Sequence, residues 1–226
     1  NTEGDSNTGF GRSALQTNST GVDNTAVGRN ALISSTASNN TAVGSCALKT
    51  NTTGADNVAM GSCALGSNSQ GSSNVAIGYS ALTTNTASNN TAVGHLALRY
   101  NVGGGQNVAV GATAGDAVTT GSNNTILGYE AAGKLTTGGD NVAVGRAALF
   151  DTTTQSGNTA VGVEALNNNT AADNVAVGKL ALYTNTTGTA NTAVGYESLR
   201  INATGANNTA VGFCALRNNT GADNTA

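Results

Sequence analysis

One unit of 16 or 17 residues recurs along almost the whole chain, and this repeat limits what the chain can fold into. Each copy opens with Asn, and positions within a copy are numbered here from that Asn. The 13 full copies, called coils 1 to 13, open at Asn7, Asn24, Asn40, Asn57, Asn74, Asn90, Asn107, Asn124, Asn141, Asn158, Asn174, Asn191 and Asn208. A unit this short has no room for two helices, so each copy is expected to be one turn of a stack.

Several positions hardly vary among the 13 copies. Position 1 is always Asn and position 5 is always Gly, while position 2 is Thr or Val and position 4 is apolar. Position 3 is Ala in 11 copies, position 8 is Ala in 12, position 9 is Leu in 11 and position 12 is Asn in nine. The pattern lacks the i, i+3, i+4, i+7 stripe of a helix, and Gly, Asn and Thr are poor helix formers.

Coil 3 illustrates the structure that these positions predict. Thr41–Val43 is expected to be a short strand because β-branched residues favour strands. Gly44 is expected to turn the corner, since Gly accepts a positive φ, and Leu48 to anchor a second short side. The rest of the coil, up to Asp56, has turn chemistry. Alternate side chains of a strand point to opposite faces, so one face is Thr/Val and the other is Ala/Gly.

The sequence therefore predicts an all-β protein, a parallel β-solenoid of 13 coils. Residues 1–6 would form an incomplete entry coil and residues 7–226 a single repeat array, with variant coils at 107–157. Stacked coils bring equivalent side chains together at about 4.8 Å, so Asn amides can form ladders. The expected structural ladders include Asn40, Asn57 and Asn74 at position 1, and Gly44, Gly61 and Gly78 at position 5.

The composition excludes several classes of function. Charged residues make up 9% of the chain against about 25% in a typical globular domain, and the net charge is −3. This gives no basic footprint for nucleic acid or for an anionic membrane. No apolar run reaches the length of a membrane-spanning helix, and the first residues do not read as a signal peptide. Because the repeat is still running at Ala226, we interpret the chain as part of a longer protein.

The residues that could carry chemistry are scattered. Cys46, Cys63 and Cys214 all occupy position 7, where in-register side chains favour free thiols over a disulfide. The single histidine, His95, is far from all three, so neither a metal site nor a catalytic set built on histidine is expected. No cofactor is predicted either. Coils 7 to 9 replace the Asn of position 12, which we interpret as a second turn type, with a local ligand patch as the alternative.

Position 6 is the variable position with bulky side chains, and it supplies the candidate contact residues. Tyr and Arg are favoured at recognition surfaces; the alternative is an edge under loose constraint. The aromatic members are Tyr79, His95, Tyr129, Tyr196 and Phe213. The sequence also contains N-x-S/T sequons, and those in the turn after position 11 are candidate glycosylation sites, although an Asn/Thr-rich repeat generates sequons by composition alone. They are Asn18, Asn51, Asn185 and Asn202.

The copies NTAVGSCAL, NVAIGYSAL and NTAVGHLAL resemble the repeats of YadA-like heads of trimeric autotransporter adhesins. They are also similar to the NTAVGxxALxxNTTG arrays of phage tail-fibre-type proteins. The resemblance covers Asn7 to Ala226 and implies a left-handed β-roll, in which three chains pack together on a cell surface or a virion. Such a trimer would account for the Ala/Gly face.

These observations support three hypotheses of function. The first is a non-catalytic structural fibre or adhesin shaft, extracellular or on a virion, that associates with itself as a homotrimer or fibre. The second is the receptor- or glycan-binding head of a fibre, with position 6 or coils 7 to 9 as the contact. The third is an ice-binding solenoid that uses Thr ladders, against which the irregular 16- and 17-residue steps weigh.

Overall fold

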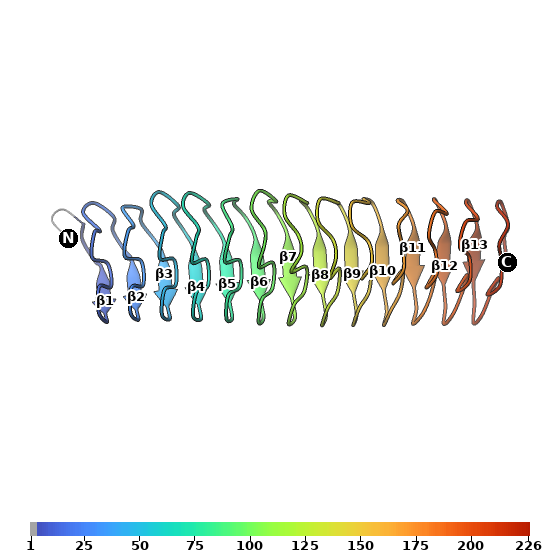
Figure 1. The fold of residues 1–226 in the computed structure, drawn as a ribbon, viewed down its shortest axis with the longest axis horizontal. Coiled ribbons are helices and arrows are strands. Elements are labelled where there is room, and N and C mark those ends of the chain that lie inside the picture. The colour runs from blue at the N-terminus through green and yellow to red at the C-terminus, as the bar shows by residue number, and fades with distance from the viewer. Residues whose placement is uncertain (1–3) are drawn as a thin grey trace. The chain divides into compact units, whose positions relative to one another are not determined.

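A computed structural model describes residues 4–226, and in that range the protein is an all-β solenoid (Figure 1). The first three residues of the expected entry coil lie outside the described residues. Each of the 13 coils contributes one three-residue strand at positions 2 to 4, as predicted. The strands are β1 (Thr8–Phe10), β2 (Thr25–Val27), β3 (Thr41–Val43), β4 (Val58–Met60), β5 (Val75–Ile77), β6 (Thr91–Val93), β7 (Val108–Val110), β8 (Thr125–Leu127), β9 (Val142–Val144), β10 (Thr159–Val161), β11 (Val175–Val177), β12 (Thr192–Val194) and β13 (Thr209–Val211).

Two compact units make up the chain, Asn1–Ala112 and Thr113–Ala226, and each is described by itself. In the first unit, β1 to β7 pair in sequence order, and in the second unit β8 to β13 do the same. Every pair is parallel and in register, so that Ala42 lies beside Ala59 and Ala59 beside Ala76. This register confirms that each position of one coil lies next to the same position of the following coil.

The interior of each coil is filled by small side chains and one large one. The Ala of position 3 and the Ala-Leu of positions 8 and 9 are fully buried, as at Ala42, Ala47 and Leu48. The expectation that the Ala/Gly face packs against a sister chain is therefore wrong. The Ala side chains fill the coil's own interior, and the face that points outward carries the Thr or Val of position 2 and the apolar residue of position 4.

Positions 8 and 9 also differ from the prediction of a second regular side. They lie in a continuous turn, and the strand at positions 2 to 4 is the one strand of each coil in the described residues. Leu occupies the left-handed region at position 9, with φ of 47° at Leu48 and 50° at Leu82. Position 7 and the last position of the coil are left-handed too, as at Cys46 and Asp56. Left-handed backbone is disfavoured for residues with a Cβ, so the stack must compensate for it.

Hydrogen bonds between coils supply that compensation. Cys46 N donates to Arg29 O of the preceding coil at 2.9 Å, and Leu48 N donates to Ala64 O of the following coil at 3.0 Å. Asp56 N donates to Ser38 O at 3.3 Å. The left-handed residues thus turn their N–H groups along the stack, and the backbone ladder continues through the turns as well as through the strands.

The Asn of position 1 forms a buried ladder within each unit. Asn57 N and Asn57 Nδ2 both donate to Asn40 Oδ1 at 3.1 Å, and Asn74 repeats both bonds onto Asn57 Oδ1. Asn57 Nδ2 also donates to Gly71 O, in the turn of its own coil, at 2.9 Å. One amide therefore ties together two coils and closes a turn, which explains why no other residue occupies this position.

The Gly of position 5 is required by conformation and by space. Gly44, Gly61 and Gly78 have φ between 134° and 138°, a region that residues with a Cβ rarely adopt. A Cβ on Gly78 would lie 2.4 Å from Gly94 O of the next coil. The corner consequently brings two backbones together more closely than any side chain permits.

Coils 7 and 8 show how the core tolerates variation. They carry Gly115 and Ala132 in place of the Leu of position 9, and both have Val118 or Leu135 in place of the Asn of position 12. Val118 and Leu135 are fully buried. The apolar volume lost at position 9 therefore returns three residues later, which supports the interpretation of these coils as a second turn type within the same architecture.

Candidate functional site: the variable edge

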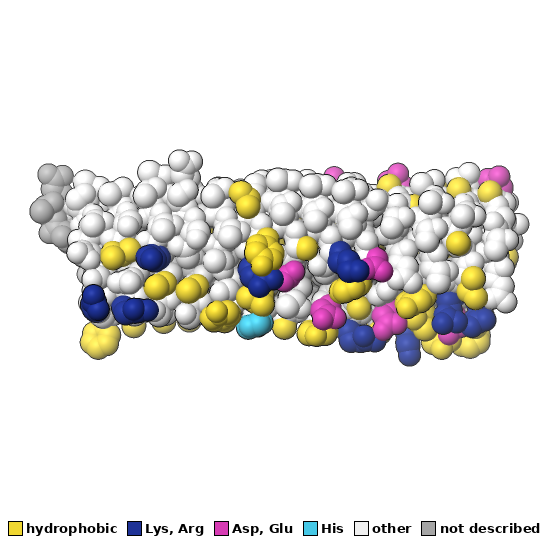
Figure 2. All heavy atoms as spheres, in the orientation of Figure 1, with side chains coloured by type: hydrophobic (Ala, Val, Ile, Leu, Met, Phe, Trp, Pro, Cys, Tyr) yellow, Lys and Arg dark blue, Asp and Glu magenta, His cyan; other side chains and the backbone are white. Residues whose placement is uncertain are grey.

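Positions 6, 7 and 10, which we call the variable edge, change their residue type from coil to coil. Position 6 directly follows the Gly corner, so its side chain leaves the coil outward. Tyr79 is 55% exposed, Tyr129 53% and Phe213 78%. In the view of Figure 2, coloured hydrophobic and charged side chains gather along one edge of each unit, whereas the opposite edge is mostly white. The predicted contact residues therefore lie on an accessible surface.

Stacking brings four of the five predicted contact residues together in pairs. The rings of Tyr79 and His95 lie 5.5 Å apart at an angle of 16°, and those of Tyr196 and Phe213 lie 5.2 Å apart at 10°. The spacing follows from the stack, because the members of each pair occupy position 6 in adjacent coils. Next to Tyr129 along the stack, position 6 of coil 9 is Arg146, which is not aromatic. A hydrogen bond with Glu130 raises the pKa of the Tyr129 phenol.

Ion pairs in the second unit join neighbouring coils. Lys134 Nζ lies 2.6 Å from Asp151 Oδ1, and Arg146 pairs with Glu164. Both pairs are exposed, so each contributes little to stability on its own. They do show that opposite charges face each other in adjacent coils, whereas like charges in register would repel.

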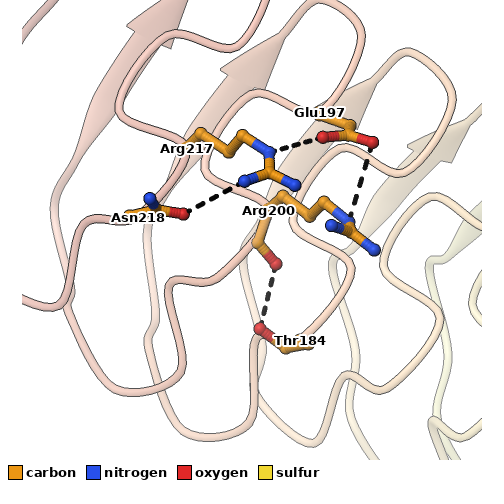
Figure 3. A network of polar contacts seen from close by, with 5 residues as sticks. All are labelled: Thr184, Glu197, Arg200, Arg217 and Asn218. Carbon is orange, nitrogen blue, oxygen red and sulfur yellow. Dashed lines mark hydrogen bonds and ion pairs between the residues drawn. The ribbon is translucent and has the colours of Figure 1, made fainter.

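The densest polar cluster joins coils 12 and 13 (Figure 3). Glu197 Oε2 accepts a hydrogen bond from Arg217 Nε at 2.5 Å, and Glu197 Oε1 lies 3.9 Å from Arg200 Nε. The hydrogen bond from Arg217 is the largest cause that holds the pKa of Glu197 below its usual value. Thr184 Oγ1 donates to Arg200 O at 2.9 Å and fixes the backbone that carries this arginine. The cluster was not predicted from the sequence, because its two arginines lie at position 10, where arginine and aromatic residues also recur.

A shallow hollow of about 180 Å³ opens in the variant coils, within the second unit. It exists because Gly133 stands at position 10, next to the half-buried ring of Phe150 in the following coil. Asp116, Glu130 and Thr113 complete its lining. A Cβ on Gly133 would lie 2.7 Å from the Phe150 ring, so the ring leans over the glycine. The hollow lies in the variant coils for which the sequence left a local ligand patch as the alternative.

The three cysteines are half-buried free thiols. Cys46 and Cys63 occupy the same position in adjacent coils, and the Sγ atom of each lies 3.8 Å from the hydroxyl of the preceding serine. Within residues 4–226, no group of three or more His, Cys, Asp or Glu side chains is placed to hold a metal ion.

The four sequon asparagines in the turn after position 11 are buried, which weighs against their glycosylation in the folded chain. The side chains of Asn18, Asn51, Asn185 and Asn202 are at most 1% exposed. Each Nδ2 donates to a backbone carbonyl in its own turn, as Asn51 Nδ2 does to Gly54 O at 2.7 Å. A buried amide that closes a turn is not accessible to a glycosyltransferase, and a sugar there would not fit inside the coil.

Comparisons with protein-family models, with curated proteins and with solved structures found no match to this chain. In the described part of the chain, no helix is long and apolar enough to cross a membrane. The function therefore has to be argued from the fold and from the variable edge.

Proposed function

We propose that this protein is a non-catalytic structural segment of an extracellular or virion-surface fibre, an adhesin shaft whose chains associate with one another. The observation that carries the proposal is the outward face of the strands. Position 4 is apolar in every coil and is never buried, with Val110 40%, Met60 43% and Val211 62% exposed. A continuous apolar row of this kind is typical of an interaction surface in a soluble protein.

The same face suggests how chains would pack. Position 2 is Thr or Val in every coil and never a charged residue, so in each unit the outward face of the strands carries no charge to desolvate. Short parallel strands in register also make a regular surface, on which an identical surface can pack over many coils. These features support self-association, with the homotrimer that the repeat resemblance implies as the expected state.

Light scattering of the purified chain tests this proposal. The expected mass is three times the chain's 22.0 kDa. Val161→Lys and Val177→Lys place charges on the outward face of β10 and β11 and are expected to yield single chains that remain folded. Asn168→Lys, in a turn of the same coil as β10, is the matched control and should leave the mass unchanged. A wild-type mass of one chain would contradict the proposal.

The second candidate function, a receptor- or glycan-binding head, is favoured by the exposed aromatic pairs of the variable edge. Tyr196 and Phe213 offer adjacent ring surfaces of the kind used in recognition. Glycan arrays probed with the chain test this function, and loss of signal on Tyr196→Ala would place the contact. An absence of any signal would leave the shaft function alone.

The ice-binding alternative would need threonine hydroxyls presented to water. The Thr hydroxyls at position 13 instead donate to carbonyls of the following coil, as Thr52 Oγ1 does to Ser69 O at 2.8 Å and Thr186 Oγ1 to Ala203 O at 2.7 Å. Because these hydroxyls already donate hydrogen bonds within the stack, they weigh against an array of free Thr hydroxyls at position 13. Thermal hysteresis in a solution of the chain is the measurement that would revive this alternative.

A further inference from the structure

Coils 11 to 13 of the second unit carry an unusual concentration of cations and aromatic rings. The basic patch, as we call it, consists of Lys179, Tyr183, Tyr196, Arg200, Phe213 and Arg217. These residues occupy positions 6 and 10 of three successive coils, and Glu197 lies among them at position 7. Figure 3 shows both guanidinium groups beside this one carboxylate.

The patch has an excess of positive charge that its own acid cannot balance. Arg217 holds Glu197 through a hydrogen bond of 2.5 Å, while Arg200 lies at the longer distance of 3.9 Å. One carboxylate thus faces two guanidinium groups, and the exposed ammonium of Lys179 adds a third cation. The other two cations of the unit each pair with one carboxylate, Arg146 with Glu164 and Lys134 with Asp151. An excess of this kind in a chain of net charge −3 is suited to an anionic ligand.

The aromatic residues add apolar surface beside the cations. Tyr196 and Phe213 are stacked, and their side chains are 39% and 78% exposed. The Arg200 guanidinium lies 5.9 Å from the centre of the Tyr183 ring, within the range of a cation–π contact. The Arg200 and Arg217 side chains are 30% and 36% exposed, so a ligand can reach both.

We propose that the basic patch binds an acidic saccharide, whose carboxylate or sulfate group pairs with Arg200 and Arg217 while a sugar ring packs against Tyr196 and Phe213. Guanidinium groups match the geometry of carboxylate and sulfate oxygens, and aromatic faces contact the C–H groups of a pyranose. A polyphosphate is a poorer match, because nucleic-acid binding relies on many phosphate contacts and Glu197 lies in the middle of the patch. The inference rests on the second candidate function, a glycan-binding head, and names its ligand class, whereas the shaft function stands whether or not the patch binds.

The chain offers a selective probe for the test, because it contains only three phenylalanines, Phe10, Phe150 and Phe213. Fluorine-labelled phenylalanine gives one resonance for each, and Phe213 belongs to the patch. The probes are a sulfated disaccharide, a disaccharide containing a uronic acid, and a neutral disaccharide of the same size. We expect saturable shifts of Phe213 with the two acidic sugars, no shift with the neutral sugar, and unchanged signals from Phe10 and Phe150.

Variants then separate binding from structure. Arg200→Gln and Arg217→Gln should each weaken binding about tenfold, because each removes a charge-assisted contact. Arg146→Gln, which breaks a balanced pair in the same unit, is the matched control and should leave binding unchanged. Glu197→Gln should tighten binding several-fold, since it removes the competing carboxylate; a purely structural role for the cluster predicts no such gain. Circular dichroism verifies that each variant is folded.

Several outcomes would overturn the inference. These are the absence of a Phe213 shift at millimolar acidic sugar, an equal response to the neutral sugar, or an equal loss in Arg146→Gln. Tighter binding of a single-stranded oligonucleotide than of either acidic sugar would assign the patch to a different class of ligand. A response to only one of the two acidic sugars would support the inference and identify the acidic group that the patch selects.

Discussion

Gly78 and Tyr79 are neighbours in the chain, yet they belong to two regions of the coil that follow opposite rules. Gly78 forms the corner, where a Cβ would meet the next coil's backbone. The Tyr79 side chain points from that corner into solvent, and other coils have Arg, Ser, Tyr, His, Ala, Val, Lys or Phe at the same position. Stacking requires the same residue, Gly, at position 5, where the backbones of two coils touch. It permits different residues at position 6. The comparison separates the corner and the ladders, where contact between coils fixes the residue, from the variable edge, where the residue is free to change.

The largest effect is expected when a side chain is placed at the corner. Gly78→Ala should destabilise the fold by about 3 kcal/mol or more, because it combines an unfavourable φ with a backbone clash that cannot relax without separating two coils. Thermal unfolding followed by circular dichroism measures the loss. Tyr79→Ala is the control in the same coil and should change stability by about 0.5 kcal/mol or less. Equal losses for the two variants would remove the distinction between corner and edge.

The next effect distinguishes the two Asn positions within coil 12. Asn191 N and Nδ2 donate to Asn174 Oδ1, and Asn191 Oδ1 accepts two bonds from Asn208, so Asn191→Ala should cost about 2–4 kcal/mol. The Asn202 side chain makes a single hydrogen bond, from Nδ2 to Gly205 O, and its buried Oδ1 has no partner. Asn202→Ala should therefore cost about 1 kcal/mol, because it removes a single hydrogen bond. Chemical denaturation measures the stability of both variants. A larger loss at Asn202 than at Asn191 would contradict the prediction.

The third test exchanges apolar volume between positions 9 and 12 of coil 8. Ala132→Leu alone should overpack the core and destabilise by about 1–3 kcal/mol, and Leu135→Asn alone should leave a cavity. The double variant restores the arrangement of the ordinary coils and should recover most of the loss. A double-mutant cycle measures this coupling, and strictly additive losses would show that the two positions do not share one space.

The smallest effect concerns pH at the variable edge. The folded state lowers the pKa of Glu197, so this group stabilises the fold above its unfolded value near 4.5. That contribution disappears as the pH falls through the lower folded value. Glu197→Gln should therefore lose a little stability at pH 7 and become less sensitive to acid between pH 5 and the folded pKa. Unfolding curves recorded across this range test the sign, and an unchanged acid dependence would contradict it.

The regular part of this fold could be predicted from the sequence because a repeated residue reports a repeated environment. Thirteen glycines at position 5 indicated the corner, and thirteen asparagines at position 1 indicated the ladder. The inward direction of the Ala face could not be read from alternation, since Ala and Gly suit a narrow interior as well as a chain contact. From the sequence, Val118 and Leu135 are only interruptions of the Asn ladder at position 12. The structure shows that both side chains fill the space left by the missing Leu of position 9.

The left-handed conformation of the turns can be predicted only in part from the residue types at those positions. The last position of a coil is Asp or Asn in nine of 13 copies, and these residues tolerate positive φ better than most. Leu at position 9 gives no such hint, because Leu is not a left-handed residue by preference. Its conformation follows from the hydrogen bond of its N–H to the next coil, which is a property of the stack. The Glu197 cluster is also a property of the stack, because its two arginines come from different coils.

Hydrogen exchange of the turn amides tests the central claim most directly, that bonding between coils runs through the turns as well as the strands. Cys46, Leu48 and Asp56 each donate to a neighbouring coil from left-handed backbone. The account predicts that these amides exchange as slowly as those of the strand Thr41–Val43. Exchange at the rate of an open turn, with protection confined to the strand, would contradict it.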